Sequence, residues 1–149
     1  MDKADASYHY ESIKDLGLDE SAGAIYIGVF LAWSATRGLM ATHHQDAIAA
    51  AHRRSEKPSE YAYAYSCGEF HNGDFTAAGV SFANSYYRAY LKFLDNVPAF
   101  ADYEVTYTNP DTWETYDEIV VLLDDLLAYW RDGRESCPQE LACSRRYCP

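Results

Sequence analysis

The sequence predicts a mainly α protein, a compact single-domain helical bundle, and three observations lead to this prediction. The chain has 149 residues, the usual size of one domain with a proper core. Hydrophobic residues make up 48% of it and aromatic residues 15%, which is too much for a disordered acidic chain. Two stretches, residues 21–38 and 110–131, show apolar patterns typical of helices. We place this domain in residues 1–134 and a Cys-containing tail in residues 135–149.

In the first part of the chain, one helix is predicted to be central. Residues 1–20 predict an irregular segment. Residues 21–38 carry apolar side chains on almost every side, which is typical of a helix buried in the core, and Gly38 fits its end. An Ala-rich and more polar helix follows over residues 43–56.

The segment after Pro58 allows two interpretations, so residues 59–66 stay open between helix and strand. Tyr61, Tyr63 and Tyr65 alternate with a two-residue period, as in a strand. Alanines fill the gaps, however, and a proline suits the first turn of a helix, so we favour a short helix. The predicted fold leaves room for one short hairpin.

The next part of the chain predicts a loop and a long helix. Glycines and an asparagine in residues 66–79 indicate a loop. Residues 77–95 place apolar side chains at i, i+3 and i+4, as in an amphipathic helix. Residues 99–108 alternate briefly and predict an extended segment.

The last helix is predicted over residues 110–131. Asn109 can act as its N-cap, and Pro110 suits the first helical position. Apolar residues fall on one broad face: Trp113, Tyr116, Ile119, Val120, Leu123, Leu126, Leu127 and Trp130. Acidic residues fall on the opposite arc: Asp111, Glu114, Asp117, Glu118, Asp124 and Asp125.

The charge of the chain favours a basic protein partner. The formal net charge is -11, and residues 93–130 contain nine acids and no Lys or Arg. Such a chain repels nucleic acid and anionic membranes and attracts basic proteins. Most solvated helix faces mix both signs in i, i+4 pairs, so a face of one sign indicates binding, with a plain solvated face as the alternative. The sequence contains 14 Tyr, a residue favoured at interfaces. The predicted partner-binding residues are Glu114, Asp117, Glu118, Asp124, Asp125, Tyr103 and Tyr107.

The cysteines predict free thiols rather than a metal site. The N-terminus is acidic, and the uncharged stretch of residues 22–36 is shorter than the ~20 residues that a membrane-spanning helix needs, so we expect a cytoplasmic protein with reduced thiols. Cys137, Cys143 and Cys148 are spaced more widely than the pairs of structural zinc sites. Zinc held by these thiols with Cys67 or His71 is the alternative. We expect no cofactor and no metal.

Catalytic motifs are absent from the sequence, and we expect no enzyme. His9, which stands between Tyr8 and Tyr10, and Cys67 with nearby His71 are the residues on which an enzymatic alternative would rest. His43 and His44 are neighbours whose side chains would diverge on a helix.

Three segments resemble a family of small acidic bacterial proteins of unknown function. They are Asp5-Ala6-Ser7-Tyr8-His9-Tyr10-Glu11, Gly23-Ala24-Ile25-Tyr26-Ile27-Gly28-Val29-Phe30-Leu31-Ala32-Trp33, and Asp111-Thr112-Trp113-Glu114-Thr115-Tyr116-Asp117, which leads to Trp130. The chain departs from the family pattern at Tyr26, where we expect His. The resemblance implies no site residues, but such proteins look similar to immunity proteins encoded beside toxins. We therefore expect an immunity-type protein that binds and inhibits a cognate toxin, basic and nuclease-like; the alternatives are an enzyme of unrecognised chemistry and an adaptor for another protein.

Overall fold

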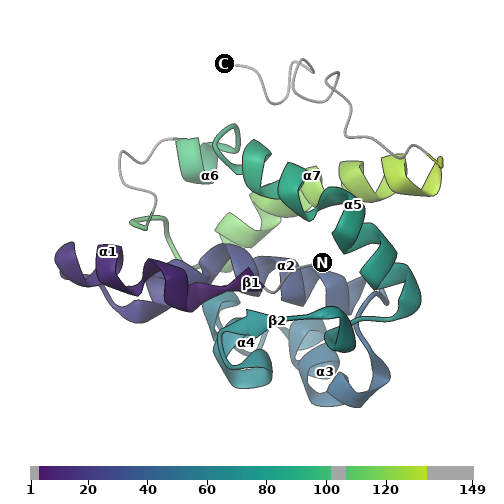
Figure 1. Cartoon of the computed structure of the whole chain (residues 1–149), viewed down its shortest axis with the longest axis horizontal. Helices are drawn as coiled ribbons and strands as arrows, with labels where there is room; N and C mark the ends of the chain where they lie inside the picture. The colour runs from purple at the N-terminus through teal and green to yellow at the C-terminus, as the bar shows by residue number, and fades with distance from the viewer. Residues whose placement is uncertain (1–3, 102–106, 134–149) are drawn as a thin grey trace.

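The computed structural model describes residues 4–101 and 107–133 and confirms a mainly α, compact single domain. The α-helices are α1 (Tyr10–Asp15), α2 (Ile25–Thr36), α3 (Gln45–Arg53), α4 (Pro58–Ser66), α5 (Ala77–Leu94), α6 (Pro98–Ala101) and α7 (Trp113–Arg131). The 3₁₀ helices are η1 (Ala6–His9), η2 (Glu20–Ala24), η3 (Thr42–His44) and η4 (Asn72–Asp74). Two short strands, β1 (Ala4–Asp5) and β2 (Glu69–Phe70), complete the fold (Figure 1).

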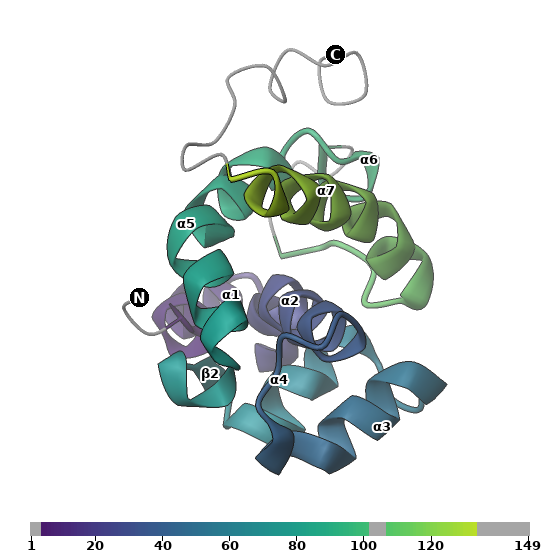
Figure 2. The same cartoon turned by 90° about the vertical axis from the view of Figure 1, so that its right-hand side faces the viewer.

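Helix α2 lies at the centre of the molecule, as its all-round apolar sequence predicts. Ten of its twelve residues are buried. It lies between α7 and α5 on one side and α3 and α4 on the other (Figure 2). The aromatic core gathers around it, since the ring of Phe30 contacts the rings of Phe70, Phe75, Phe82, Tyr87 and Tyr90.

The backbones of α2 and α4 touch at Gly28. A Cβ atom at this position would lie 1.8 Å from the carbonyl oxygen of Pro58. Because only glycine allows such an approach, Gly28 sets the distance between the two helices. Helix α4 confirms the helical interpretation of residues 59–66, and the strand alternative is wrong.

Helix α7 begins later than the sequence predicts, and the prediction of Asn109 as N-cap is wrong. Thr112 is the N-cap, with its side chain accepting a hydrogen bond from the Thr115 amide. The preceding Asp111 caps another helix instead, because its carboxylate accepts hydrogen bonds from the amide and hydroxyl of Ser59, at 3.0 and 2.5 Å. The predicted apolar face of α7 does face the core, and Leu122 joins it.

The N-terminal segment is more regular than predicted. Residues 1–20 include η1 and α1, and Ile13 of α1 is fully buried. Strand β1 pairs with β2 in antiparallel register, Ala4 opposite Phe70. The two strands are far apart in sequence, so they form no hairpin but tie the N-terminal segment to the chain between α4 and α5.

The remaining expectations are met in part. The helix predicted over residues 77–95 is α5, whereas that over residues 43–56 is the shorter pair η3 and α3. Residues 98–101 form α6, so the prediction of an extended chain is wrong for residues 99–101; residues 102–106 lie outside the described residues. No helix in the described ranges combines the length and apolar character needed to cross a membrane.

Candidate functional site

The predicted binding acids of α7 fall into two groups with different surroundings. Glu114, Glu118, Val121 and Asp125 follow one another at i, i+4, i+7 and i+11, which places them along one side of the helix. We call these four residues the outer stripe. Glu114 and Glu118 are exposed, and Val121 is 43% exposed. The outer stripe therefore surrounds an exposed apolar side chain with carboxylates.

Asp117 belongs to the second group, and it is bound by Arg54, the residue that follows the last residue of α3. The Arg54 guanidinium donates two hydrogen bonds to the Asp117 carboxylate, one of them 2.9 Å long. The same guanidinium lies over the rings of Trp113 and Tyr116, 4.9 and 5.4 Å from their centroids. Such cation–π contacts add to the charged pair. Arg54 thus fixes the first half of α7 to α3.

Asp124 is held in the same way from α2. Arg37 donates to both of its carboxylate oxygens, at 2.8 and 2.6 Å, and the Trp33 indole donates a further hydrogen bond of 2.9 Å. Burial alone would raise the pKa of the Asp124 carboxyl, but the hydrogen bonds from Arg37 and Trp33 outweigh it and lower that pKa below its ordinary value. Asp124 therefore joins α7 to the central helix.

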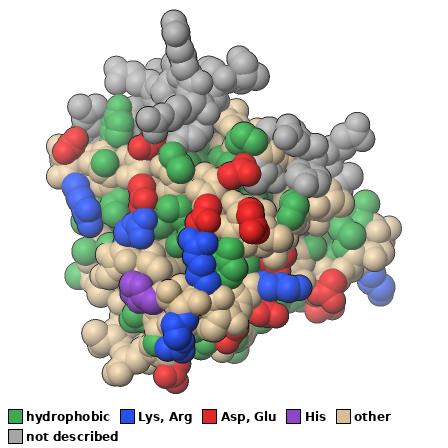
Figure 3. All heavy atoms as spheres, turned by 180° about the vertical axis from the view of Figure 1, so that it is seen from behind, with side chains coloured by type: hydrophobic (Ala, Val, Ile, Leu, Met, Phe, Trp, Pro, Cys, Tyr) green, Lys and Arg blue, Asp and Glu red, His purple; other side chains and the backbone are tan. Residues whose placement is uncertain are grey.

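Residues 93–130 contain no Lys or Arg, but in the folded protein basic side chains from other segments lie beside their acids. The fold brings Arg37 and Arg54 from other elements to two of the acids. Seen from the side opposite to Figure 1, acidic and basic side chains lie next to one another (Figure 3). Two of the acids predicted to bind a partner, Asp117 and Asp124, are therefore balanced by arginines from other parts of the chain.

The two predicted tyrosines are placed differently. Tyr107 is half-buried, and its hydroxyl lies 2.7 Å from Nδ1 of His9. Tyr103 lies outside the described residues. The Tyr107 hydroxyl is therefore engaged within the protein.

His9 lies between two tyrosines that occupy both of its ring nitrogens. The Tyr107 hydroxyl contacts Nδ1 and the Tyr26 hydroxyl contacts Nε2, each at 2.7 Å. Tyr90 donates a hydrogen bond of 2.8 Å to the backbone oxygen of Tyr26. These bonds connect η1, α2 and α5 with residue 107. We call His9, Tyr26 and Tyr107 the His9 cluster.

Burial sets the protonation of the His9 cluster. It lowers the pKa of the His9 imidazole below the ordinary 6.5 and so favours the neutral ring. Burial, with smaller contributions from Tyr107 and Asp5, raises the pKa of Tyr26 to about 12. A neutral imidazole then accepts a hydrogen bond from one phenol and donates one to the other, which suits a structural centre better than a general base.

The pairing of Cys67 with His71 is not formed. Cys67 is exposed and ends α4 in the left-handed conformation, with φ of 55°. His71 is also exposed; its backbone amide donates to the Asp74 carboxylate, and its carbonyl accepts a hydrogen bond from the Asp74 amide. Cys137, Cys143 and Cys148 lie outside the described residues.

The family of the chain follows from residues 1–118, which match the family model "Domain of unknown function (DUF7832)". The chain belongs to the DUF7832 family. The matched residues include all three segments on which the sequence resemblance rests. Comparison with curated proteins and with solved structures finds no match.

The DUF7832 match ends inside α7, so some of the residues described above lie within the matched region and others follow it. The His9 cluster and the Arg54–Asp117 pair lie within the matched residues. Asp124 and Asp125 follow them.

A histidine pair within the DUF7832 match was missed by sequence reasoning. His43 and His44 do not diverge: they lie on the 3₁₀ helix η3, and their ring centroids are 4.2 Å apart. Asp74 of η4 lies beside them. The adjacent histidines were a visible signal, but the carboxylate comes from a distant part of the chain.

Proposed function

We propose that this chain is an immunity-type protein that binds a cognate toxin, basic and nuclease-like, and inhibits it by protein–protein contact. The observation that carries the proposal is the outer stripe of α7, in which carboxylates surround the exposed Val121. The net charge of -11 supports a basic partner. Membership in DUF7832 adds no activity, because the function of that family is unknown.

In this proposal the two groups of acids have different roles: one fixes the position of α7, and the other contacts the partner. Asp117 and Asp124 hold α7 against α3 and α2 through Arg54 and Arg37. A helix fixed in this way loses little freedom on binding, so more of the contact energy is available for affinity. The outer stripe would then steer a basic surface towards α7 by its charge, and Val121 would supply an apolar contact.

The enzymatic alternative has weaker support. Both ring nitrogens of His9 are occupied by tyrosine hydroxyls, and no hydrogen bond joins Cys67 to His71 among the described residues. An adaptor for an unrelated basic protein would use the same outer stripe, so only the identity of the partner separates it from an immunity protein.

The experiment starts with capture of partners from the source organism by the purified chain. We expect a basic protein whose expression alone arrests growth and whose co-expression with this chain restores it. A variant with Glu114→Lys, Glu118→Lys and Asp125→Lys should bind that partner more weakly and fail to protect. Asp117 and Asp124 stay unchanged, so both arginine pairs that hold α7 are kept.

A matched control variant shows whether binding depends on where the acids lie or only on the net charge of the chain. Glu11→Lys, Asp15→Lys and Asp46→Lys make the same change in charge at exposed sites on α1 and α3. We expect this control to bind and protect nearly as well as the natural chain. Equal losses in both variants would show that net charge alone matters, and a non-toxic partner would refute the immunity function.

A further inference from the structure

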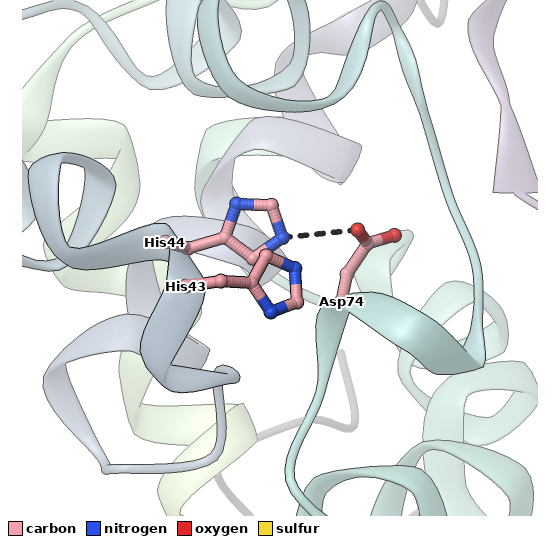
Figure 4. Close-up of side chains that lie close together, drawn as sticks. All are labelled: His43, His44 and Asp74. Atoms are coloured by element: carbon pink, nitrogen blue, oxygen red, sulfur yellow. Dashed lines mark hydrogen bonds and ion pairs between the residues drawn. The ribbon is translucent and has the colours of Figure 1, made fainter.

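We propose that His43, His44 and Asp74 form a binding site for one zinc ion, or a similar divalent transition metal, at the junction of η3 and η4. Their donor atoms, one from each residue, all lie within 4.8 Å of one another. Figure 4 shows the two imidazole rings of η3 beside the Asp74 carboxylate of η4. Imidazole nitrogen and carboxylate oxygen are the donors that zinc accepts.

Two of the three donors are already in place. Nε2 of His44 lies 3.0 Å from Oδ1 of Asp74, and each of these side chains is only 15% exposed. Ligands of one tetrahedral zinc ion stand about 3.3 Å apart when each bond is about 2.0–2.1 Å long. The spacing of His44 and Asp74 therefore suits a shared ion with little movement.

The third donor, His43, is exposed and can move. Its ring lies against that of His44, with 4.2 Å between centroids and an angle of 42° between the ring planes. A shift of about 1.5 Å or less would bring its nitrogen to ligand distance, since the donor atoms already lie within 4.8 Å of one another. Since His43 faces solvent, the fourth position on the metal would be open to water or a small anion, as in zinc sites with three protein ligands.

Backbone hydrogen bonds join the segment of residues 39–41, which precedes the histidines, to the segment of residues 74–76, which includes Asp74. The Ala41 amide donates to the Asp74 carbonyl and the Thr76 amide donates to the Leu39 carbonyl, both at 2.9 Å. Met40 and Phe75 form an antiparallel bridge between these bonds. The two segments that carry the donors are thus held side by side before any ion binds, which lowers the cost of assembling the site.

A hydrogen bond from outside the cluster orients the carboxylate. The His71 amide donates to Oδ2 of Asp74 at 2.7 Å, which leaves Oδ1 for the histidines. Hydrogen bonds of this kind hold metal ligands in position and tune affinity by about 10–100-fold. When an ion binds, the hydrogen bond between His44 and Asp74 is replaced by two bonds to the metal, and any proton on Nε2 of His44 passes to solvent.

The test is calorimetric titration of the metal-free full chain with Zn²⁺ alone. Cys67, Cys137, Cys143 and Cys148 are replaced by Ser in one arm, so that thiolates cannot account for binding. We expect one zinc ion per chain in both arms and a higher melting temperature when zinc is present. Binding that disappears in the serine arm would overturn the proposal.

Single variants locate the site. His43→Ala and Asp74→Asn should weaken zinc binding by about 10-fold or more. His52→Ala, which removes an exposed histidine of α3 outside the cluster, should leave it unchanged. Equal affinity in all three variants would contradict the assignment.

Bound Co²⁺ gives an independent readout. It should show d–d absorption without the charge-transfer bands of cobalt–thiolate bonds. Charge-transfer bands that persist in His43→Ala would place the metal on the cysteines instead.

Discussion

Leu123 lies on the apolar face of α7 and is packed in the core, where its side chain has no exposed surface. Replacing it with Ala leaves a cavity in addition to the lost apolar burial, so we expect a loss of about 2–5 kcal/mol in the free energy of unfolding. Urea denaturation measures this loss. Val121→Ala on the exposed side of the same helix should change stability by only about 0.5 kcal/mol or less. Similar losses in both variants would show that the orientation of α7 is wrong.

We expect His9 to make the stability of the fold depend on pH. The folded pKa of its imidazole lies below 6.5, so the unfolded chain binds more protons as the pH falls through that value. The stabilisation from neutral His9 is therefore present above pH 6.5 and is lost below it. We expect the natural chain to lose more stability across this range than His9→Gln, as measured by denaturation at several pH values.

His52→Gln is the matched control for the pH experiment, because His52 is exposed on α3. This variant should keep the pH dependence of the natural chain. An imidazole of His9 that titrates above 6.5 in an NMR experiment would contradict the account of the His9 cluster.

At the scale of elements, the contact between α2 and α4 depends on a single glycine. A methyl group at Gly28 would overlap the Pro58 carbonyl, so Gly28→Ala must push the helices apart. We expect a loss of about 1–3 kcal/mol or more, measured by thermal or urea unfolding. Gly73→Ala is the control, because a Cβ atom there meets no atom within 4 Å. A neutral Gly28→Ala would show that the two helices are not in backbone contact.

The pairing of α7 with α2 predicts a second pH effect. The pKa of Asp124 is lowered below 3.8, so the stabilisation from its carboxylate is complete above pH 3.8 and is lost as the pH falls through the lowered value. Because much of this carboxylate is exposed, solvent screens the pair, and Asp124→Asn should cost about 1 kcal/mol or less at neutral pH. The difference from the natural chain should shrink in acid.

Asp132→Asn tests whether the acid effect is specific. Asp132 is exposed at the end of the same helix, and its replacement should leave unfolding nearly unchanged at every pH. A constant difference between Asp124→Asn and the natural chain down to strong acid would mean that charge does not hold α7 to α2.

Periodicity predicted those elements that bury a continuous apolar face. Helices α2, α5 and α7 repeat their apolar side chains over many turns, so the local pattern and the fold agree. The sequence pattern placed the start of α7 too early, because Asp111 accepts a hydrogen bond from Ser59 of α4 and does not belong to α7. This contact joins distant parts of the chain, so no local pattern predicts it. Strands β1 and β2 are two residues long and leave no period to detect.

The functional surfaces were less accessible to sequence reasoning than the helices. The acids of α7 were visible as a cluster, but Arg37 and Arg54 come from distant segments, and no local pattern announces such pairs. The same holds for Asp74 beside His43 and His44, because Asp74 is thirty residues away in the sequence and is brought there by the pairing of the segments around Met40 and Phe75.

For the whole molecule, we expect the outer stripe of α7 to attract a basic protein. The most direct measurement is the association rate with the captured partner at low and high ionic strength, for the natural chain and for the Glu114→Lys, Glu118→Lys, Asp125→Lys variant. Steering by charge raises association rates by about 10–10³ at low salt and fades as the Debye length shrinks. We predict a steep salt dependence for the natural chain and a slow, nearly flat rate for the variant. Equal rates for both proteins at both ionic strengths would show that the outer stripe does not attract the partner.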